Sequence, residues 1–273
     1  MDDTMHGWRF DEAQTTNFDF EEHVDCPTSR LIESFILEAI ELEECRTIIG
    51  PPGCGKSATA KRVVSENRHI RYVTATPSSS GLKAFLRNVC STFGVYTSSL
   101  DNARIERDLW NELYRLLYNY PMALICDEAQ NLDLKTLRTA LFLHDQTGLP
   151  VILIGNSAVL NRTRTKQAAF DQIADRQGPP LEIDGISRRD VEAFGIHHKV
   201  EGREAYELLV NFGEEERSFR GVVRLLKRAR SIAGPKSSIH LSHLQGAASE
   251  LLGRSATKRL IGETEPKTLQ VVT

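Results

Sequence analysis

Apolar residues along the chain follow two different periods, and the change from one period to the other defines the predicted elements. Short and nearly continuous apolar runs predict buried strands at 45–49, 70–76, 121–127, 150–156 and 180–183. Apolar residues at helical spacing predict helices between these strands, at 58–64, at about 80–92, at 101–118 and around 134–141. Strands that alternate with helices are typical of a parallel sheet covered by helices on both faces. We therefore predict an α/β fold.

Helical patterns flank this α/β region on both sides. A helix is predicted at 27–44. Beyond Asp184 only helical patterns remain: Ser187 and Asp190 have the spacing of a capping box, which marks the start of a helix, and further helices are predicted at 203–213, 218–232 and 242–252. The chain thus divides into an α/β domain at 25–184 and a small all-helical domain at 185–253. Residues 1–24 form an acidic arm whose aromatic residues are either mobile or docked on a neighbouring surface. Residues 254–273 are expected to be a disordered tail.

The loop after the first strand matches a phosphate-binding pattern. Its residues, G-x-x-x-x-G-K-[ST], are Gly50, Pro51, Pro52, Gly53, Cys54, Gly55, Lys56 and Ser57, and Ala58 opens the following helix. A strand, a loop and a helix in this order turn backbone N–H groups towards a phosphate, at the positive end of the helix dipole. Lys56 is expected to reach the β- and γ-phosphates, and Ser57 to ligate Mg²⁺. We therefore expect a nucleoside triphosphate, ATP, to bind here.

Two carboxylates end the strand at 121–127. Asp127 is placed to hold Mg²⁺ as a Walker B acid, and Glu128, pointing elsewhere, is placed to polarise the attacking water as a general base. The alternative is a solvated strand end that carries two acids. The additional strand at 70–76 and this acid pair favour hydrolysis of the nucleotide over phosphoryl transfer to a second substrate.

Two polar residues elsewhere leave alternatives open. Asn156 ends the strand at 150–156, where it either orients the attacking water beside the γ-phosphate or caps the next helix. Arg224, in the run Gly221-Val222-Val223-Arg224, is predicted to lie on a mostly apolar helix face, from which it either snorkels to water or reaches a phosphate.

Composition narrows the class of partner. The 273 residues carry a formal net charge of −3, with an isoelectric point of about 6.3, so any contact with DNA has to come from a local basic face. The five cysteines show no Cys-x-x-Cys spacing, and two of them fall inside the nucleotide motifs, which favours a reducing compartment. No signal peptide or run of membrane-spanning length is apparent, and we expect a cytoplasmic protein without a membrane partner.

Taken together, these motifs and the helical domain that follows them resemble the AAA+ ATPases, and within them the ATPase subunits of DNA transposition. The resemblance runs from about residue 25 to residue 253 and includes T-A-T-P-S at 74–78, D-E-A-Q-N-L at 127–132, I-G-N at 154–156 and G-V-V-R at 221–224. It implies that Asn156 is sensor 1 and Arg224 is sensor 2. It also implies an arginine that acts on the neighbouring subunit's nucleotide, for which Arg176 is the candidate because Gln172 occupies the first expected position.

The family resemblance further implies a regulator rather than a metabolic enzyme. ATP-bound subunits would self-associate on double-stranded DNA as a ring or helical filament, select a transposition target and recruit a transposase, with slow hydrolysis ending the assembled state. Candidate DNA contacts are Lys83 and Arg87, with Arg162, Arg164 and Lys166 as a second patch; the alternative for each is a solvated helix face. Two other functions stay open: a helicase loader or initiator, and a signalling or secretion NTPase that binds no DNA.

Overall fold

The computed structural model describes residues 23–98, 101–159, 179–253, 257 and 259–260. Within them, five parallel strands form one sheet in the order β2-β3-β4-β1-β5. The strands are β1 (Arg46–Ile49), β2 (Ile70–Thr74), β3 (Ala123–Asp127), β4 (Val151–Gly155) and β5 (Leu181–Glu182). The predicted parallel α/β sheet is confirmed. Because the strands are parallel, the loops that leave β1, β3 and β4 all emerge at one edge of the sheet, where the candidate site lies.

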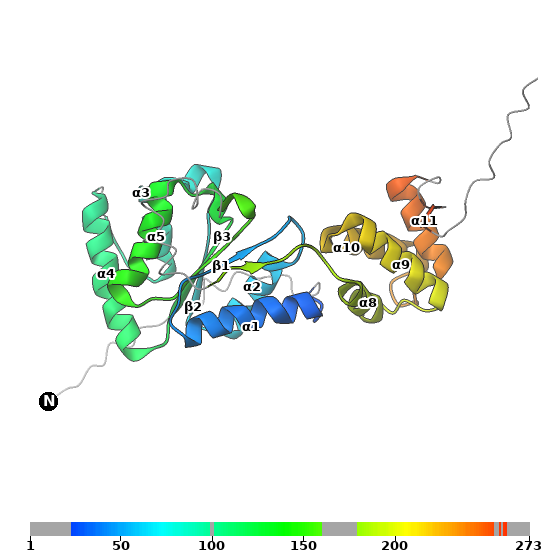
Figure 1. Cartoon of the computed structure of the whole chain (residues 1–273), viewed down its shortest axis with the longest axis horizontal. Coiled ribbons are helices and arrows are strands. Elements are labelled where there is room, and N and C mark those ends of the chain that lie inside the picture. The colour runs from blue at the N-terminus through cyan, green and yellow to red at the C-terminus, as the bar shows by residue number, and fades with distance from the viewer. Residues whose placement is uncertain (1–22, 99–100, 160–178, 254–256, 258, 261–273) are drawn as a thin grey trace, which may run out of the picture.

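Alternate residues along each strand bury into two separate apolar layers. On one face, Ile48 and Ile125 pack with Ile32 and Ile36 of α1 (Pro27–Glu41) and with Val63 of α2 (Lys56–Glu66). On the other face, strand residues including Leu124 and Cys126 pack beneath α3 (Leu82–Thr92), α4 (Asn102–Asn119) and α5 (Leu134–Thr147). Figure 1 shows α1 and α2 on one side of the strands and α3, α4 and α5 on the other. Burial on both faces explains the continuous apolar runs.

Beyond β5 the chain is helical, as the sequence pattern predicts. The helices are α8 (Arg188–His197), α9 (Arg203–Glu216), α10 (Phe219–Ala233) and α11 (Leu241–Leu252). They enclose a third apolar core, which includes Phe212, Leu225 and Leu226, and lie to one side of the sheet domain in Figure 1. Val24 and Cys26, which precede α1, also pack into this core, so the first described residues of the chain belong to the helical unit.

A buried carboxylate joins the two parts. Asp190, at the third position of α8, caps that helix through the Ser187 backbone N–H and hydroxyl, both 2.7 Å from Oδ2. It also accepts hydrogen bonds from Thr28 at the start of α1, from the backbone N–H and from the hydroxyl, both at 2.8 Å. Asp190 is fully buried. The capping box predicted from the sequence therefore also connects the helical domain to the sheet domain.

Element boundaries differ from the predictions by a few residues where local hydrogen bonding decides them. The helix expected at 27–44 ends at Glu41, because Glu43 takes a left-handed backbone conformation with φ of 51°. The stretch after β2 forms a short 3-10 helix, η3 (Pro77–Ser79), capped by the Thr76 side chain. All five cysteines are buried as free thiols. None of the described helices is both long and apolar enough to cross a membrane.

Candidate nucleotide-binding site

The glycine-rich loop between β1 and α2 forms a cradle around an open space. Gly53 and Gly55 have φ values of +81° and +89°, which favour glycine, and Gly55 precedes α2 without any side-chain cap on its first amides. The Lys56 Nζ atom donates to the Gly50 and Pro51 carbonyl oxygens, at 2.9 Å each. These contacts hold the ammonium group of Lys56 inside the loop. Ser57 lines the same space, and its hydroxyl makes no hydrogen bond with the described residues.

The two acids at the end of β3 have different surroundings. Asp127 is buried, and its two carboxylate oxygens accept from the Glu128 backbone N–H (2.8 Å) and from the Tyr72 hydroxyl on β2. Glu128 lies at a left-handed turn, with φ of 54°, and its carboxylate accepts from the Gln130 side chain. The two carboxylates thus have different hydrogen-bond partners, and both residues line the cavity. Sequence reasoning found the acids but missed Tyr72 and Gln130.

Asn156 follows β4 and lines the same cavity. Its side-chain oxygen accepts from the Ala158 backbone N–H at 2.9 Å, so the helix-capping interpretation of Asn156 is correct as a contact. Its side-chain nitrogen makes no hydrogen bond with the described residues. The two interpretations weighed from the sequence are therefore compatible: one amide atom caps, and the other is available to a ligand. The role of Asn156 as sensor 1 remains a prediction.

The start of α10 lies directly on the phosphate-binding loop. The Phe219 backbone N–H donates to the Gly53 carbonyl at 2.8 Å. The Phe219 ring covers Gly55, where an added Cβ would lie 3.1 Å from the ring, and stacks on Phe194 of α8 with a centroid distance of 4.8 Å. Both glycines therefore owe their lack of a side chain to the helical domain as well as to their backbone conformation.

The outward face of α10 is a basic stripe that faces the cavity. It consists of Arg220, Arg224, Lys227 and Arg228, spaced at i, i+4, i+7 and i+8. The sequence-based placement of Arg224 on an apolar face was wrong. The apolar residues around it in sequence, Val222 and Leu225 among them, are buried on the opposite side of the helix, while Arg224 is exposed.

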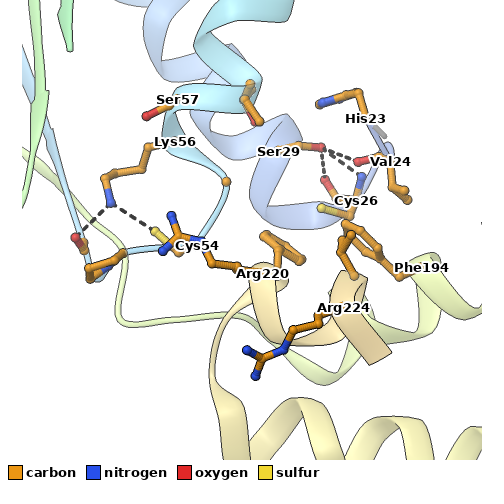
Figure 2. Close-up of a pocket in the computed structure, with 18 of the residues that line it drawn as sticks. His23, Val24, Cys26, Ser29, Cys54, Lys56, Ser57, Phe194, Arg220 and Arg224 are labelled. Atoms are coloured by element: carbon orange, nitrogen blue, oxygen red, sulfur yellow. Dashed lines mark hydrogen bonds between the residues drawn. The ribbon is translucent and has the colours of Figure 1, made fainter. Parts of the chain in front are cut away.

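Arg220 is one of the cavity residues on this helix that sequence reasoning missed. Its side chain extends from α10 towards the loop that carries Cys54 and Lys56, whereas the Arg224 guanidinium lies farther from that loop (Figure 2). Neither arginine makes a hydrogen bond or an ion pair with the described residues. The signal that points to Arg220 is its spacing, one helical turn before Arg224.

The cavity between the two domains has a volume of about 1150 Å³. Its polar end holds the loop, both acids and Asn156, and another part is lined by His23, Val24, Cys26 and Ser29 before and within α1. A cavity of this kind, with one polar end that carries charged groups and one partly apolar wall, is large enough for a small molecule.

The residues present fit a nucleotide with its metal ion. The loop offers backbone N–H groups at the start of α2, and Lys56 with the two unpaired arginines supplies positive charge for a polyphosphate. The Ser57 hydroxyl and the Asp127 carboxylate are hard oxygen ligands of the kind that Mg²⁺ prefers. The parts predicted for Gly50, Pro51, Pro52, Gly53, Cys54, Gly55, Lys56, Ser57, Ala58 and Arg224 in holding the nucleotide, and for Ser57 and Asp127 in holding Mg²⁺, remain predictions.

The candidate DNA contacts are only partly described. Lys83 and Arg87 lie one turn apart on α3, opposite the face that buries Leu82, Phe85 and Leu86. Arg162, Arg164, Lys166 and the candidate trans-acting Arg176 lie outside the described residues.

Comparison with known proteins agrees with this arrangement. Residues 40–162 match the family model described as an AAA domain. Among solved structures, the ORC2 protein of Aeropyrum pernix, in complexes with ADPNP and ADP, superposes with a TM-score of 0.60 at 20% identity, over 82% of this chain and 66% of that one. Cdc6p of Pyrobaculum aerophilum superposes with a TM-score of 0.64 at 14% identity, over 85% of this chain and 69% of that one. The fold is a P-loop AAA+ domain followed by a small helical domain, and such a fold implies nucleotide binding.

Within that class, the chain is similar to proteins of DNA transposition. It is 26% identical to the ATP-dependent target DNA activator B of Escherichia phage Mu over 235 residues, which cover 84% of this chain and 73% of the phage protein. It is 27% identical to the Mu-like prophage FluMu DNA transposition protein B of Haemophilus influenzae over 142 residues, which cover 52% of this chain and 48% of the prophage protein. The resemblance to transposition ATPases noted in the sequence is confirmed.

Proposed function

We propose that this protein is an ATP-hydrolysing AAA+ regulator of DNA transposition, which binds duplex DNA in its ATP-bound state, selects the target site and recruits a transposase. The observation that carries the proposal is the similarity to the target DNA activator of phage Mu, which extends across both domains. The cavity between these domains supports it, because a nucleotide bound there would contact the loop on one side and α10 on the other.

Each group at the edge of the sheet has a part in the proposed hydrolysis. Lys56 and the backbone of the loop bind the β- and γ-phosphates, and Mg²⁺, held by Ser57 and Asp127, would supply charge neutralisation at the transferred group. Glu128 accepts a proton from the attacking water, and Asn156 orients that water. Arg220 and Arg224 stabilise phosphate charge from the helical domain.

Assembly on DNA follows from the same proposal. Lys83 and Arg87, with Arg162, Arg164 and Lys166, would supply contacts to the DNA backbone in each subunit of a ring or filament. Contacts that are weak in one subunit become strong when they are repeated along an oligomer, and they lose strength steeply with salt. A protein of net charge −3 can therefore retain duplex DNA through a repeated local stripe.

The proposal is tested by measuring ATP hydrolysis and duplex DNA binding with ATP, with ADP and without nucleotide. Lys56→Ala should abolish nucleotide binding, since it removes the charge that meets the phosphates. Glu128→Gln should bind ATP, hydrolyse it at least about 100-fold more slowly and stay on DNA. Replacing both Lys83 and Arg87 by Ala should weaken binding to all DNA sequences alike and leave ATP binding intact.

Three results would contradict the proposal at different points. Equal hydrolysis rates of wild type and Glu128→Gln would remove Glu128 as the base. Absence of duplex DNA binding by the wild type with ATP at low salt would favour an NTPase that acts on a protein partner. DNA binding without any stimulation of a transposase would favour a helicase loader or initiator.

A further inference from the structure

Gln130 connects two groups of the candidate site that come from different strands. It is the middle residue of the short 3-10 helix η4 (Ala129–Asn131), which begins directly after Glu128, and its side chain lines the cavity. Its amide nitrogen donates to the Glu128 Oε2 atom, and its amide oxygen accepts from the Asn156 backbone N–H at 3.4 Å. One side chain therefore joins the carboxylate at the end of β3 to the end of β4.

Gly155, the last residue of β4, gives this side chain its space. A Cβ atom at position 155 would lie 2.5 Å from the Gln130 Oε1 atom, which is closer than any real contact of this kind. The φ angle of Gly155 is not in the left-handed region, so backbone conformation does not demand glycine here. A side chain here would instead have to displace the Gln130 amide and the Val159 Cγ2 atom, which also lies 2.5 Å from such a Cβ. The glutamine in D-E-A-Q and the glycine in I-G-N are thus parts of one arrangement.

The backbone around Glu128 is fixed as well. Its left-handed conformation is held by the Asp127 Oδ1 atom, which accepts from the Glu128 N–H, and by the Asn131 N–H, which donates to the Glu128 carbonyl at 2.8 Å. Residues in this conformation persist where surrounding contacts determine them, and they gather at functional sites. With the backbone fixed, the rotation of the side chain decides where the carboxylate lies, and Gln130 is the described group that holds it.

We propose that Gln130 is a positioning residue: its amide holds the Glu128 carboxylate beside Asn156, so that both groups meet the same attacking water. This inference rests on the proposed function, in which Glu128 is the general base. A glutamine suits the task because its amide has both a donor, for the carboxylate, and an acceptor, for the strand-end N–H. Misplacement of a reacting group by about 1 Å can cost on the order of 100-fold in rate.

The first test separates turnover from binding. Gln130→Met has nearly the same length but no hydrogen-bonding amide. It should lower kcat for ATP at least about 10-fold and change KM less than about 2-fold, because phosphate binding does not involve Gln130. Gln130→Glu should lower kcat as much or more, since it places a second carboxylate against Glu128. The matched control is Gln146→Met, which makes the same change on the exposed side of α5 and should retain the wild-type kcat.

The second test needs no nucleotide. Tm is measured for Glu128→Ala, Gln130→Ala and the double variant, and the loss in the double variant should be smaller than the sum of the single losses by about 1–2 °C, as for two groups in contact. Wild-type kcat in both Gln130 variants, or additive Tm losses, would overturn the inference. Failure of the proposed function has a different signature: no ATP hydrolysis by the wild type itself.

Discussion

At the scale of single residues, the two neighbouring acids of the site differ in the hydrogen bonds that they accept. Asp127 has both carboxylate oxygens occupied by donors from the protein, whereas the Glu128 carboxylate meets one side-chain amide. Burial raises the pKa of the Tyr72 hydroxyl, and the negative charge of Asp127 raises it further. Tyr72 therefore stays protonated, as a donor to Asp127, over the whole physiological range.

Tyr72→Phe should raise the Mg²⁺ concentration needed for half-maximal ATP hydrolysis about 10-fold. The substitution removes the hydrogen bond that orients the Asp127 carboxylate, which is predicted to hold the ion. The ring remains, so its packing against the apolar layer beneath α1 and α2 is kept. The measurement is a Mg²⁺ titration at saturating ATP. Tyr96→Phe, on a 90% exposed side chain, is the matched control. An unchanged Mg²⁺ requirement would show that the Tyr72 hydroxyl does not orient Asp127.

Arg220→Ala should weaken ATP binding about 10-fold or more, because a charge-assisted hydrogen bond to phosphate contributes about 1.5–3 kcal/mol. The effect should exceed that of Arg224→Ala, since the Arg220 side chain extends towards the loop (Figure 2). Fluorescent-nucleotide titration measures both, with Arg203→Ala, on the exposed surface of α9, as control. A loss confined to Arg224→Ala would mean that α10 changes its position when ATP binds.

At the scale of elements, the Asp190 network sets the pH dependence of stability. Burial alone would raise the pKa of Asp190, but the hydrogen bonds from Ser187 and Thr28 outweigh burial and hold this pKa below the ordinary value of 3.8. A carboxyl group whose pKa is lower in the folded state stabilises the protein above its unfolded pKa. That stabilisation is lost as the pH falls through the folded-state value.

Asp190→Asn should lower the free energy of unfolding by about 2–4 kcal/mol at pH 7, since it leaves buried donors without their acceptor. The difference from wild type should shrink as the pH falls from 4 towards 2. Urea unfolding at several pH values measures this, and Asp25→Asn, an exposed acid paired with Arg30, is the control. Equal losses in the two variants at pH 7 would contradict the role of Asp190.

Elements with strong periodicity were predictable from the sequence, and their mutual contacts were not. The apolar run that became β3 and the helical spacing of α4 depend on local order in the chain, so both were found. The contact between the start of α10 and Gly53 joins residues more than 160 positions apart, and no local pattern reports it. Arg224 lies next to apolar residues in the sequence, but successive residues of a helix point in different directions, and Arg224 is exposed while Val222 and Leu225 are buried.

The candidate site likewise contains residues that the sequence predicts and residues that only the tertiary contacts bring in. Lys56, Asp127 and Asn156 occupy fixed places in motifs, so sequence alone brought them together, and the structure places all of them around one cavity. Tyr72 and Gln130 act through side-chain hydrogen bonds whose geometry depends on strand order and on the space left by Gly155. Tyr72 belongs to no motif, and the D-E-A-Q-N-L segment that contains Gln130 does not by itself indicate the partners of its side chain.

At the scale of the whole molecule, the proposed assembly predicts sharing of active sites between subunits. Arg176→Ala should lower ATP turnover, and Lys56→Ala should abolish it, yet mixtures should recover activity. Only the mixture forms interfaces in which an intact Arg176 of one subunit meets an intact phosphate-binding loop of its neighbour. An arginine that acts in trans can raise the rate of hydrolysis on the order of 10³- to 10⁵-fold. Activity is measured across mixing ratios. No recovery at any ratio would place the trans-acting group elsewhere.

Burial makes Cys26, Cys45, Cys90 and Cys126 nearly unreactive towards thiol reagents in the folded chain. Burial raises the pKa of Cys45 and Cys126 to about 12 and that of Cys26 and Cys90 to about 11, so little thiolate exists at neutral pH. A single cysteine introduced on an exposed helix face away from the proposed DNA contacts, such as Arg203→Cys on α9, would react faster than these four thiols. Fluorophores attached there could follow subunits gathering on DNA in real time without removal of these natural cysteines.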